Sequence, residues 1–278
     1  MQLEHYEGLL KDLAIPPRPD VVTVLVEEMG LDEPDLNRVT RVIAKDPGLA
    51  AGMLRAANSP FFGLNRAVSS VPKAISVLGL KHFSNIATGL AIRFAMSQGD
   101  KAKRFERFWD TAEKSALMGH YFAEKLRGVA ADEAYTFGLF HDCGIPLLMQ
   151  RFPHYEETLK RANEAEGVGF AKVEEVEIGT SHNIVGYFLA RSWLLSDDMC
   201  QAILRHHEVK VFEDPAVHGN VLSLIGIGHL TEHVQHLSMR SSEDVEWGKF
   251  QTAVMDHFAL TEEDLLNLQD GAQAILAG

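Results

Sequence analysis

Residues 75–94 read ISVLGLKHFSNIATGLAIRF, and their apolar side chains recur at a helical rather than an alternating spacing. The positions that form this apolar stripe are Ile75, Leu78, Phe83, Ile86, Ala87, Leu90 and Phe94. Apolar residues three or four positions apart are typical of a helix that turns one face to a core. Residues 108–126 repeat the pattern, and no strand pair, hairpin turn or internal repeat stands out. The sequence therefore predicts an all-α fold.

Signals for helix starts support this fold class. Asp46-Pro47 and Ser70-Val71-Pro72 each place a capping side chain ahead of a proline in the first helical turn. Thr261 precedes three acidic residues, which the helix macrodipole favours at the start of a last helix. We expect Asp46 to cap a helix that begins at Pro47, and Asn58-Ser59-Pro60 to end that helix.

Charge and histidine content change near residue 100. Residues 1–100 hold 10 Lys/Arg and 11 Asp/Glu, whereas residues 101–278 hold 16 and 28, so the second part carries nearly all of the net charge of −13. Ten of the 13 histidines lie from His141 onward. The polar segment 97–104 falls at this change and contains a glycine. We therefore expect two packed helical subdomains, residues 1–100 and residues 101–278.

Composition also excludes several classes of protein. No run approaches the ~20 apolar residues that cross a bilayer, the N-terminus lacks the pattern of a secretion signal, and two cysteines are too few for a disulfide framework. These observations predict a cytoplasmic protein without a membrane partner. The acidic excess repels phosphate backbones and disfavours nucleic acid. A third and weaker idea is a basic face in the first part that binds nucleic acid, and the alternative is an ordinary solvated surface. The residues of this face would be Arg38, Arg41, Lys45, Arg55 and Arg66.

The segment GLFHDCG, residues 138–144, carries the sharpest candidate site. Adjacent His141 and Asp142 can supply an imidazole nitrogen and a carboxylate oxygen to one divalent cation. Gly144 relaxes the backbone, which helps the two side chains to converge. The alternative is a helix-end pair whose polar atoms bond to the backbone. Cys143 is interpreted as a buried thiol rather than a reactive one.

Two further segments add histidines to the candidate set. His182 follows Gly179-Thr180-Ser181, and His206 and His207 are adjacent. Consecutive helical residues point about 100° apart, so we do not expect His206 and His207 to hold the same ion. They could serve two neighbouring metals, or one could ligate while the other contacts a phosphate. The alternative for this pair is a polar helix terminus, where the dipole favours imidazolium.

His229, His233 and His236 share one helical face, a spacing that could hold a metal. We favour a solvated histidine stripe, whose charge would respond to pH near 6–7. Glu232 is the nearby acidic residue, and we expect it to point elsewhere.

The segments taken in order resemble one family. Those of the first part are IPPRP (15–19), VIAKDPGL (42–49), LRAANS (54–59) and AISVLG (74–79); those of the second are Phe108-Trp109, the His-Asp pair, Ser181 through Trp193 and the His-His pair. Together they resemble the HD superfamily of metal-dependent phosphohydrolases, most closely its HDOD branch of bacterial signalling domains. The resemblance implies an HDOD-specific helical region, residues 1–100, and an HD-like helical core, residues 101–278, which together form one HDOD unit.

The resemblance also implies a metal site, although it leaves open whether any cofactor is bound. The ion would be divalent, such as Fe, Mn, Zn or Mg. The candidate ligands, which could be vestigial, are His141, Asp142, His182, His206 and His207.

Departures from the family pattern bear on activity. Thr111 stands where the first metal-binding histidine is expected, and His120 lies on the opposite helical face. His229 stands at the place of the later aspartate that closes the metal site. Cyclic-dinucleotide-cleaving relatives have a lysine at the place of Ile145 and a Gly-Tyr-Pro element after the His-His pair, which residues 208–212 lack. Metal-assisted hydrolysis requires a firmly held ion with an open position, and acid catalysis requires a nearby proton donor.

We therefore expect a signalling module without catalysis, which acts by binding a protein partner or a small ligand and keeps a degenerate metal site. The alternative is a metal-dependent phosphohydrolase that acts on a nucleotide or a cyclic dinucleotide.

Overall fold

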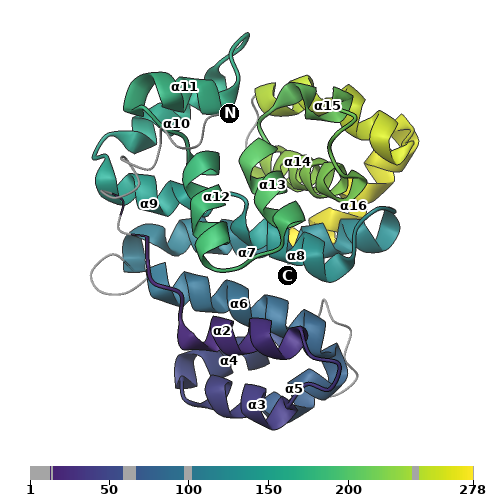
Figure 1. Ribbon diagram of the computed structural model, residues 1–278. Helices are drawn as coiled ribbons and strands as arrows, with labels where there is room; N and C mark the ends of the chain where they lie inside the picture. The colour runs from purple at the N-terminus through teal and green to yellow at the C-terminus, as the bar shows by residue number, and fades with distance from the viewer. Residues whose placement is uncertain (1–12, 14, 59–66, 97–101, 240–243, 278) are drawn as a thin grey trace. The chain divides into compact units, whose positions relative to one another are not determined.

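The computed structural model describes residues 13, 15–58, 67–96, 102–239 and 244–277. Within these ranges the regular structure is helical throughout, which confirms the all-α prediction (Figure 1). Contacts divide the chain into two compact units. One is Pro16–Trp109, and the other holds Asp110–Gly278 with the described residues ahead of Pro16. No helix of the described ranges is long and apolar enough to pass through a bilayer.

The division between the units falls inside α7 (Ala102–Lys125), between Trp109 and Asp110. Our expected boundary at residues 97–104 lies largely on residues outside the described ranges. The subdomains 1–100 and 101–278 therefore stay a prediction.

The first unit consists of short helices packed around α6 (Leu80–Met96), which contacts α2, α4 and α5. Its other helices are α2 (Asp20–Met29), α3 (Leu36–Ala44), α4 (Pro47–Ala57) and α5 (Val71–Leu78). Its core contains fully buried aliphatic and aromatic side chains, among them Val22, Leu25, Ile43, Met53 and Phe83.

Local capping in this unit follows the sequence closely. The Asp46 carboxylate accepts hydrogen bonds from the backbone N–H groups of Gly48 and Leu49, at 2.9 and 3.0 Å, as predicted. Asn58 follows the last residue of α4, and its side chain bonds to both backbone groups of Val68, at 2.6 and 2.8 Å. Ser59 and Pro60 lie outside the described residues. Ser70 precedes α5 as expected, but its side chain makes no capping hydrogen bond.

The stripe over residues 75–94 belongs to two helices rather than one. α5 ends at Leu78 and α6 begins at Leu80. Gly79 between them has a φ of +77°, a backbone conformation that glycine adopts without steric cost. Helical periodicity does not reveal this break, because apolar residues on both sides still face one core.

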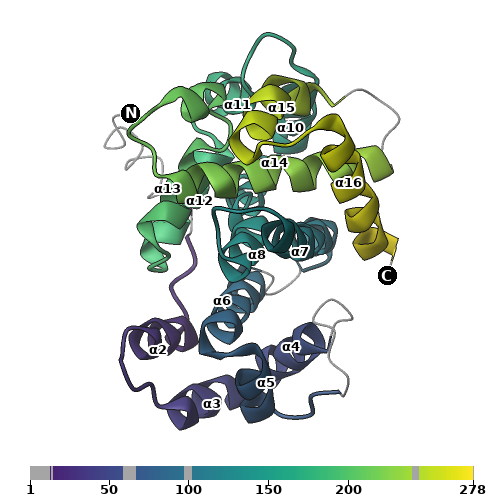
Figure 2. The ribbon, with the colours of Figure 1, turned by 90° about the vertical axis from the view of Figure 1, so that its right-hand side faces the viewer.

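The second unit is organised around α14 (Gly219–Met239), which packs against α8, α13, α15 and α16. In Figure 2, α14 runs across this unit with α15 above it and α8 below it. The remaining elements are α8 (Ala131–Phe140), α9 (Gly144–Arg151), α10 (Tyr155–Glu164), α11 (Phe170–Ile178), α12 (His182–Ser192), α13 (Asp197–Arg205), the 3₁₀ helix η4 (Val209–Glu213), α15 (Val245–Phe258) and α16 (Glu262–Ala277). The core joins Phe122 of α7 to Leu230 of α14, Phe250 of α15 and Leu265 of α16.

Gly144 lets α9 and α12 approach each other at backbone distance. A Cβ atom at this position would lie 2.0 Å from the His182 carbonyl oxygen and 2.9 Å from the Gly186 nitrogen. The glycine therefore serves close packing, not the backbone flexibility that we expected from the sequence. Because α9 and α12 approach so closely, Asp142, two residues before Gly144, lies next to the start of α12.

Candidate metal centre

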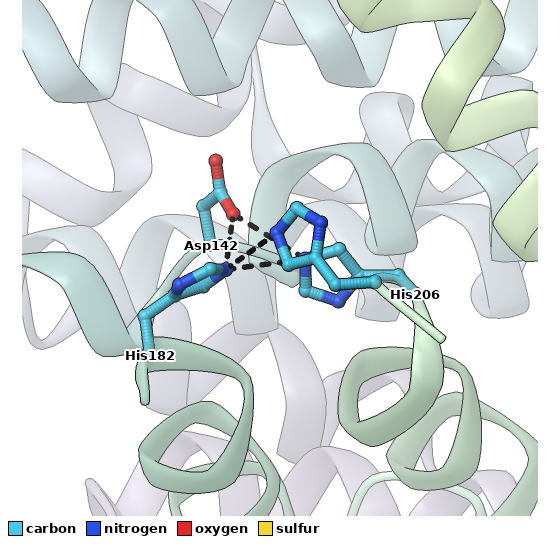
Figure 3. A group of neighbouring side chains, drawn as sticks. Asp142, His182 and His206 are labelled. Atoms are coloured by element: carbon cyan, nitrogen blue, oxygen red, sulfur yellow. Dashed lines mark hydrogen bonds and ion pairs between the residues drawn. The ribbon is translucent and has the colours of Figure 1, made fainter. Parts of the chain in front are cut away.

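Four of the five predicted ligands meet in the second unit. Asp142, His182, His206 and His207 each offer one ligand atom, and these atoms all lie within 4.8 Å of one another. Asp142 lies in the turn between α8 and α9, His182 begins α12, and the His206-His207 pair follows α13. Figure 3 shows Asp142, His182 and His206 pointing toward one another. We call these four residues the histidine cluster.

His206 and His207 both face His182, contrary to our expectation that they diverge. Their Nε2 atoms lie 3.2 and 3.1 Å from His182 Nε2, and their ring centroids are 4.1 Å apart. The expectation was wrong because α13 ends at Arg205, so the two histidines lie in the turn that follows it.

The acceptors beside the Nδ1 atoms indicate that each of these imidazoles keeps a hydrogen on Nδ1. Each Nδ1–H donates to an oxygen that can only accept: Glu174 Oε2 at 2.7 Å from His182, Ile203 O at 2.7 Å from His206 and Glu246 Oε1 at 2.9 Å from His207. Each Nε2 is thereby left as the ligand atom, and all three point to one place. Metal-binding histidines characteristically donate the other ring N–H to a carboxylate or carbonyl in this way.

Within the histidine cluster, the Asp142 carboxylate interacts electrostatically with the imidazoles, and its Oδ1 lies 3.3 Å from His182 Nε2. Burial lowers the pKa of His182, but the carboxylates of Glu174 and Asp142 raise it to about 10 overall. Burial and the neighbouring His207 lower the pKa of His206 to about 3. Near neutral pH and without a metal, His182 therefore carries a hydrogen on both ring nitrogens, and a bound cation would displace the hydrogen of Nε2.

His141, the fifth predicted ligand, faces the other oxygen of Asp142. Its Nε2 lies 3.6 Å from Asp142 Oδ2 and 3.1 Å from Glu232 Oε1, while its Nδ1 donates to the Phe137 carbonyl at 3.2 Å. Burial lowers the pKa of His141, but Asp142 and Glu232 raise it to about 9 overall. His141, Asp142 and Glu232 form a second group with metal-ligand spacing.

The prediction that Glu232 points elsewhere is therefore wrong. Glu232 Oε2 also lies 3.3 Å from His229 Nδ1, one helical turn earlier on α14. A usable signal was present in the sequence, because Glu232 follows His229 by three positions, a spacing that places both side chains on one face of a helix.

The histidine stripe on α14 is buried rather than solvated, which corrects a second expectation. His229 is 3% exposed and stacks on Phe250, and His233 is 9% exposed and stacks on Trp247. His236 is partly buried and lines the pocket described below. None of the three belongs to a group with metal-ligand spacing among the described residues.

Thr111 and His120, the two residues of α7 weighed in place of the first metal-binding histidine, both lie outside the ligand groups. Thr111 is exposed, and its carbonyl accepts a hydrogen bond from Gln235 Nε2 at 3.4 Å. His120 is buried with its Nε2 3.6 Å from Glu124 Oε1. Neither joins the two ligand groups found in the described residues. Cys143 is a fully buried free cysteine, and burial raises the pKa of its thiol. Both observations agree with the interpretation of Cys143 as a packed rather than a reactive thiol.

Sequence reasoning missed the two carboxylates that orient the cluster, Glu174 and Glu246. Glu174 lies on α11 and contacts His182 at the start of α12, whereas Glu246 lies on α15 and contacts His207 after α13. No local motif marks either residue, because each contact arises only when separate helices pack together.

A pocket of about 230 Å³ opens beside the cluster, with Asp142 and His207 in its wall. Ile145 and Trp247 supply apolar surface. Its lining residues include four carboxylates and neither lysine nor arginine; the four are Asp142, Glu232, Asp244 and Glu246.

Comparison with known proteins shows which family and which solved structures this chain resembles. The sequence model of the HDOD domain matches residues 15–209. Among curated proteins, an uncharacterized protein of Treponema pallidum (strain Nichols) is 23% identical over 222 residues, which are 77% of this chain and 42% of that protein. The chain thus spans less than half of the length of this relative.

Solved structures share the fold. A predicted phosphohydrolase from Shewanella amazonensis SB2B has a TM-score of 0.70 and 21% identity, over 96% of this chain and 93% of the other. An HDOD domain protein with unknown function from Geobacter sulfurreducens has a TM-score of 0.68 and 20% identity, over 99% and 98%. A predicted signal transduction protein from Marinobacter aquaeolei VT8 has a TM-score of 0.68 and 24% identity, over 95% and 59%. Because the HDOD sequence model covers more than half of the residues, the chain belongs to the HDOD domain family.

Proposed function

We propose that this chain is a signalling module that binds one divalent metal ion in the histidine cluster and recognises a protein partner or small ligand without hydrolysing it. The observation that carries the proposal is the shared direction of three imidazole Nε2 atoms, each preset by a hydrogen bond at Nδ1. They face one another beside the Asp142 carboxylate.

The donor set indicates which ions would fit. Three imidazole nitrogens and one carboxylate oxygen suit zinc, iron or manganese better than magnesium, which prefers oxygen ligands. Four protein ligands are also typical of closed, structural zinc sites, whereas catalytic zinc sites usually have three and keep one position for solvent or substrate. The cluster is thus better suited to holding an ion than to activating a nucleophile with it.

The pocket gives the second argument against hydrolysis. A phosphoester gains affinity and transition-state stabilisation from lysine or arginine, and no such residue lines this pocket in the described part of the chain. Ile145, at the place where the resemblance gives cyclic-dinucleotide-cleaving relatives a lysine, lines the wall with an apolar side chain instead.

A metal-dependent phosphohydrolase is the second candidate, and one observation favours it. His141, Asp142 and Glu232 form a second ligand group that shares Asp142 with the histidine cluster. Two-metal hydrolases hold neighbouring ions that together stabilise the attacking and leaving oxygens. A second ion held by these residues would add the positive charge that the pocket wall lacks.

Metal analysis and a hydrolysis panel separate the two functions. Purified protein would be loaded with Zn²⁺, Mn²⁺ or Fe²⁺, assayed for bound metal, and tested on nucleotides, phosphomonoesters and cyclic dinucleotides. The proposal expects bound metal and no turnover above that of Asp142→Ala. Metal-dependent turnover that Asp142→Ala abolishes would establish the second candidate, and absence of metal binding would refute the proposed function.

A further inference from the structure

Glu174 lies behind His182, on the side away from the other ligands, and contacts it twice. The Glu174 side chain is fully buried. Its Oε2 accepts hydrogen bonds from His182 Nδ1 at 2.7 Å and from the His182 backbone nitrogen at 3.3 Å. Its Oε1 accepts a hydrogen bond from the Tyr155 hydroxyl. Three donors therefore converge on a carboxyl group that acts only as an acceptor.

We propose that Glu174 is a positioning residue that presets His182 for metal binding, with Tyr155 holding Glu174 in place. The inference rests on the proposed function, because it concerns the same histidine cluster. Neither Glu174 nor Tyr155 lines the pocket, so neither acts on a pocket ligand by contact.

The tautomer of His182 is the link between Glu174 and the metal. When a cation displaces the Nε2 hydrogen of His182, the hydrogen donated to Glu174 stays on Nδ1, and the Nε2 lone pair faces the place where the ligand atoms of Asp142, His206 and His207 meet. Without an acceptor at Nδ1, the other neutral tautomer would place a hydrogen on Nε2, where it blocks the ligand atom.

The packing of α11 reinforces the orientation of the ring. Phe170, at the start of α11, meets His182 edge to face at a centroid distance of 5.4 Å. Ser181 precedes α12 without a side-chain capping bond, so the Glu174 contact to the His182 nitrogen satisfies a helix-start donor. One carboxyl group thus fixes both the backbone and the ring of this ligand.

Substitutions on α11 provide a matched test. Glu174→Met removes the acceptor at similar length, whereas Glu174→Gln keeps an acceptor oxygen and removes the charge. Glu177→Met and Glu177→Gln are the controls, because Glu177 lies on the same helix and pairs with Arg161 at 2.5 Å, away from the cluster. The Zn²⁺ affinity of each full-length variant would be measured by competition with a chromophoric chelator, and the Co²⁺ visible spectrum would report the ligand set.

Loss of a hydrogen-bond partner behind a ligating histidine typically weakens metal affinity by 10–100-fold. We expect about this loss for Glu174→Met with a changed Co²⁺ spectrum, a smaller loss of several-fold for Glu174→Gln, and wild-type affinity and spectrum for both Glu177 variants. A purely structural role would not produce rescue by the retained acceptor oxygen or a change in the spectrum.

The outcomes separate this inference from the proposed function. Wild-type affinity in a folded Glu174→Met would overturn the inference alone. Should that variant not fold, as judged by circular dichroism, Glu174→Gln decides, and affinity equal to that of Glu177→Gln would overturn the inference. If the wild-type protein binds no metal, the proposed function fails and the inference falls with it.

Discussion

Gly144→Ala tests whether the close approach of α9 and α12 builds the histidine cluster. The added Cβ would lie 2.0 Å from the His182 carbonyl oxygen, and ordinary contact begins at 3.4 Å, so the two backbones must separate by about 1.4 Å. The obstructing atoms belong to the backbone and cannot rotate away. Overpacking of this kind costs about 3 kcal/mol, which lowers the melting temperature of a domain of this size by about 6–12 °C. Metal affinity should fall too, because the separation pulls Asp142 Oδ1 from its position 3.3 Å from His182 Nε2.

Gly248→Ala is the matched control, since Gly248 lies within α15, is exposed and has nothing near its added Cβ. An alanine in the middle of a helix stabilises it by up to about 1 kcal/mol relative to glycine, so this variant should melt slightly higher than wild type. Thermal unfolding followed by circular dichroism and Zn²⁺ titration measure both effects. A Gly144→Ala protein with the melting temperature and metal affinity of wild type would refute the packing argument.

Two further predictions concern parts of the chain outside the cluster. Asp46→Ala removes the cap that bonds to the Gly48 and Leu49 nitrogens and should destabilise the first unit by about 1 kcal/mol; urea unfolding checks this, and an unchanged midpoint would contradict the capping role. Hydrogen bonds from Arg161 and Thr158 lower the pKa of Glu177 to about 2, from a usual value of 4.5. A lowered folded-state pKa gives stability that is complete above the unfolded value and is lost as the pH falls toward the folded one. The difference in melting temperature between wild type and Glu177→Gln should therefore shrink between about pH 5 and pH 3, and a constant difference would contradict the pairing.

The fold was predictable where its cause is local. Asp46-Pro47 and the acidic run after Thr261 mark helix starts because capping involves neighbours within a few residues. Thr261 indeed exchanges hydrogen bonds with Asp264, at 2.9 and 3.2 Å. The break at Gly79 escaped prediction, because an apolar stripe can continue across a one-residue turn.

The candidate site was predictable only where the family resemblance supplied it. Spacing alone predicted that His206 and His207 would not hold the same ion, because a periodic pattern does not show where α13 ends. Glu174 and Glu246 contact the histidines through packing of separate helices, as Glu232 contacts His141, and a single sequence does not reveal such pairings. The burial of His229 has the same origin, since Phe250 of α15 covers it.

X-ray absorption spectroscopy of the protein loaded with one equivalent of Zn²⁺ tests the central claim most directly. The account predicts a tightly held ion whose first shell contains three imidazole nitrogens and a carboxylate oxygen, with Zn–N distances of about 2.0–2.1 Å. His206→Ala should remove one imidazole from that shell. Zinc that is lost on gel filtration, or a shell without multiple imidazoles, would contradict a metal centre built by Asp142, His182, His206 and His207.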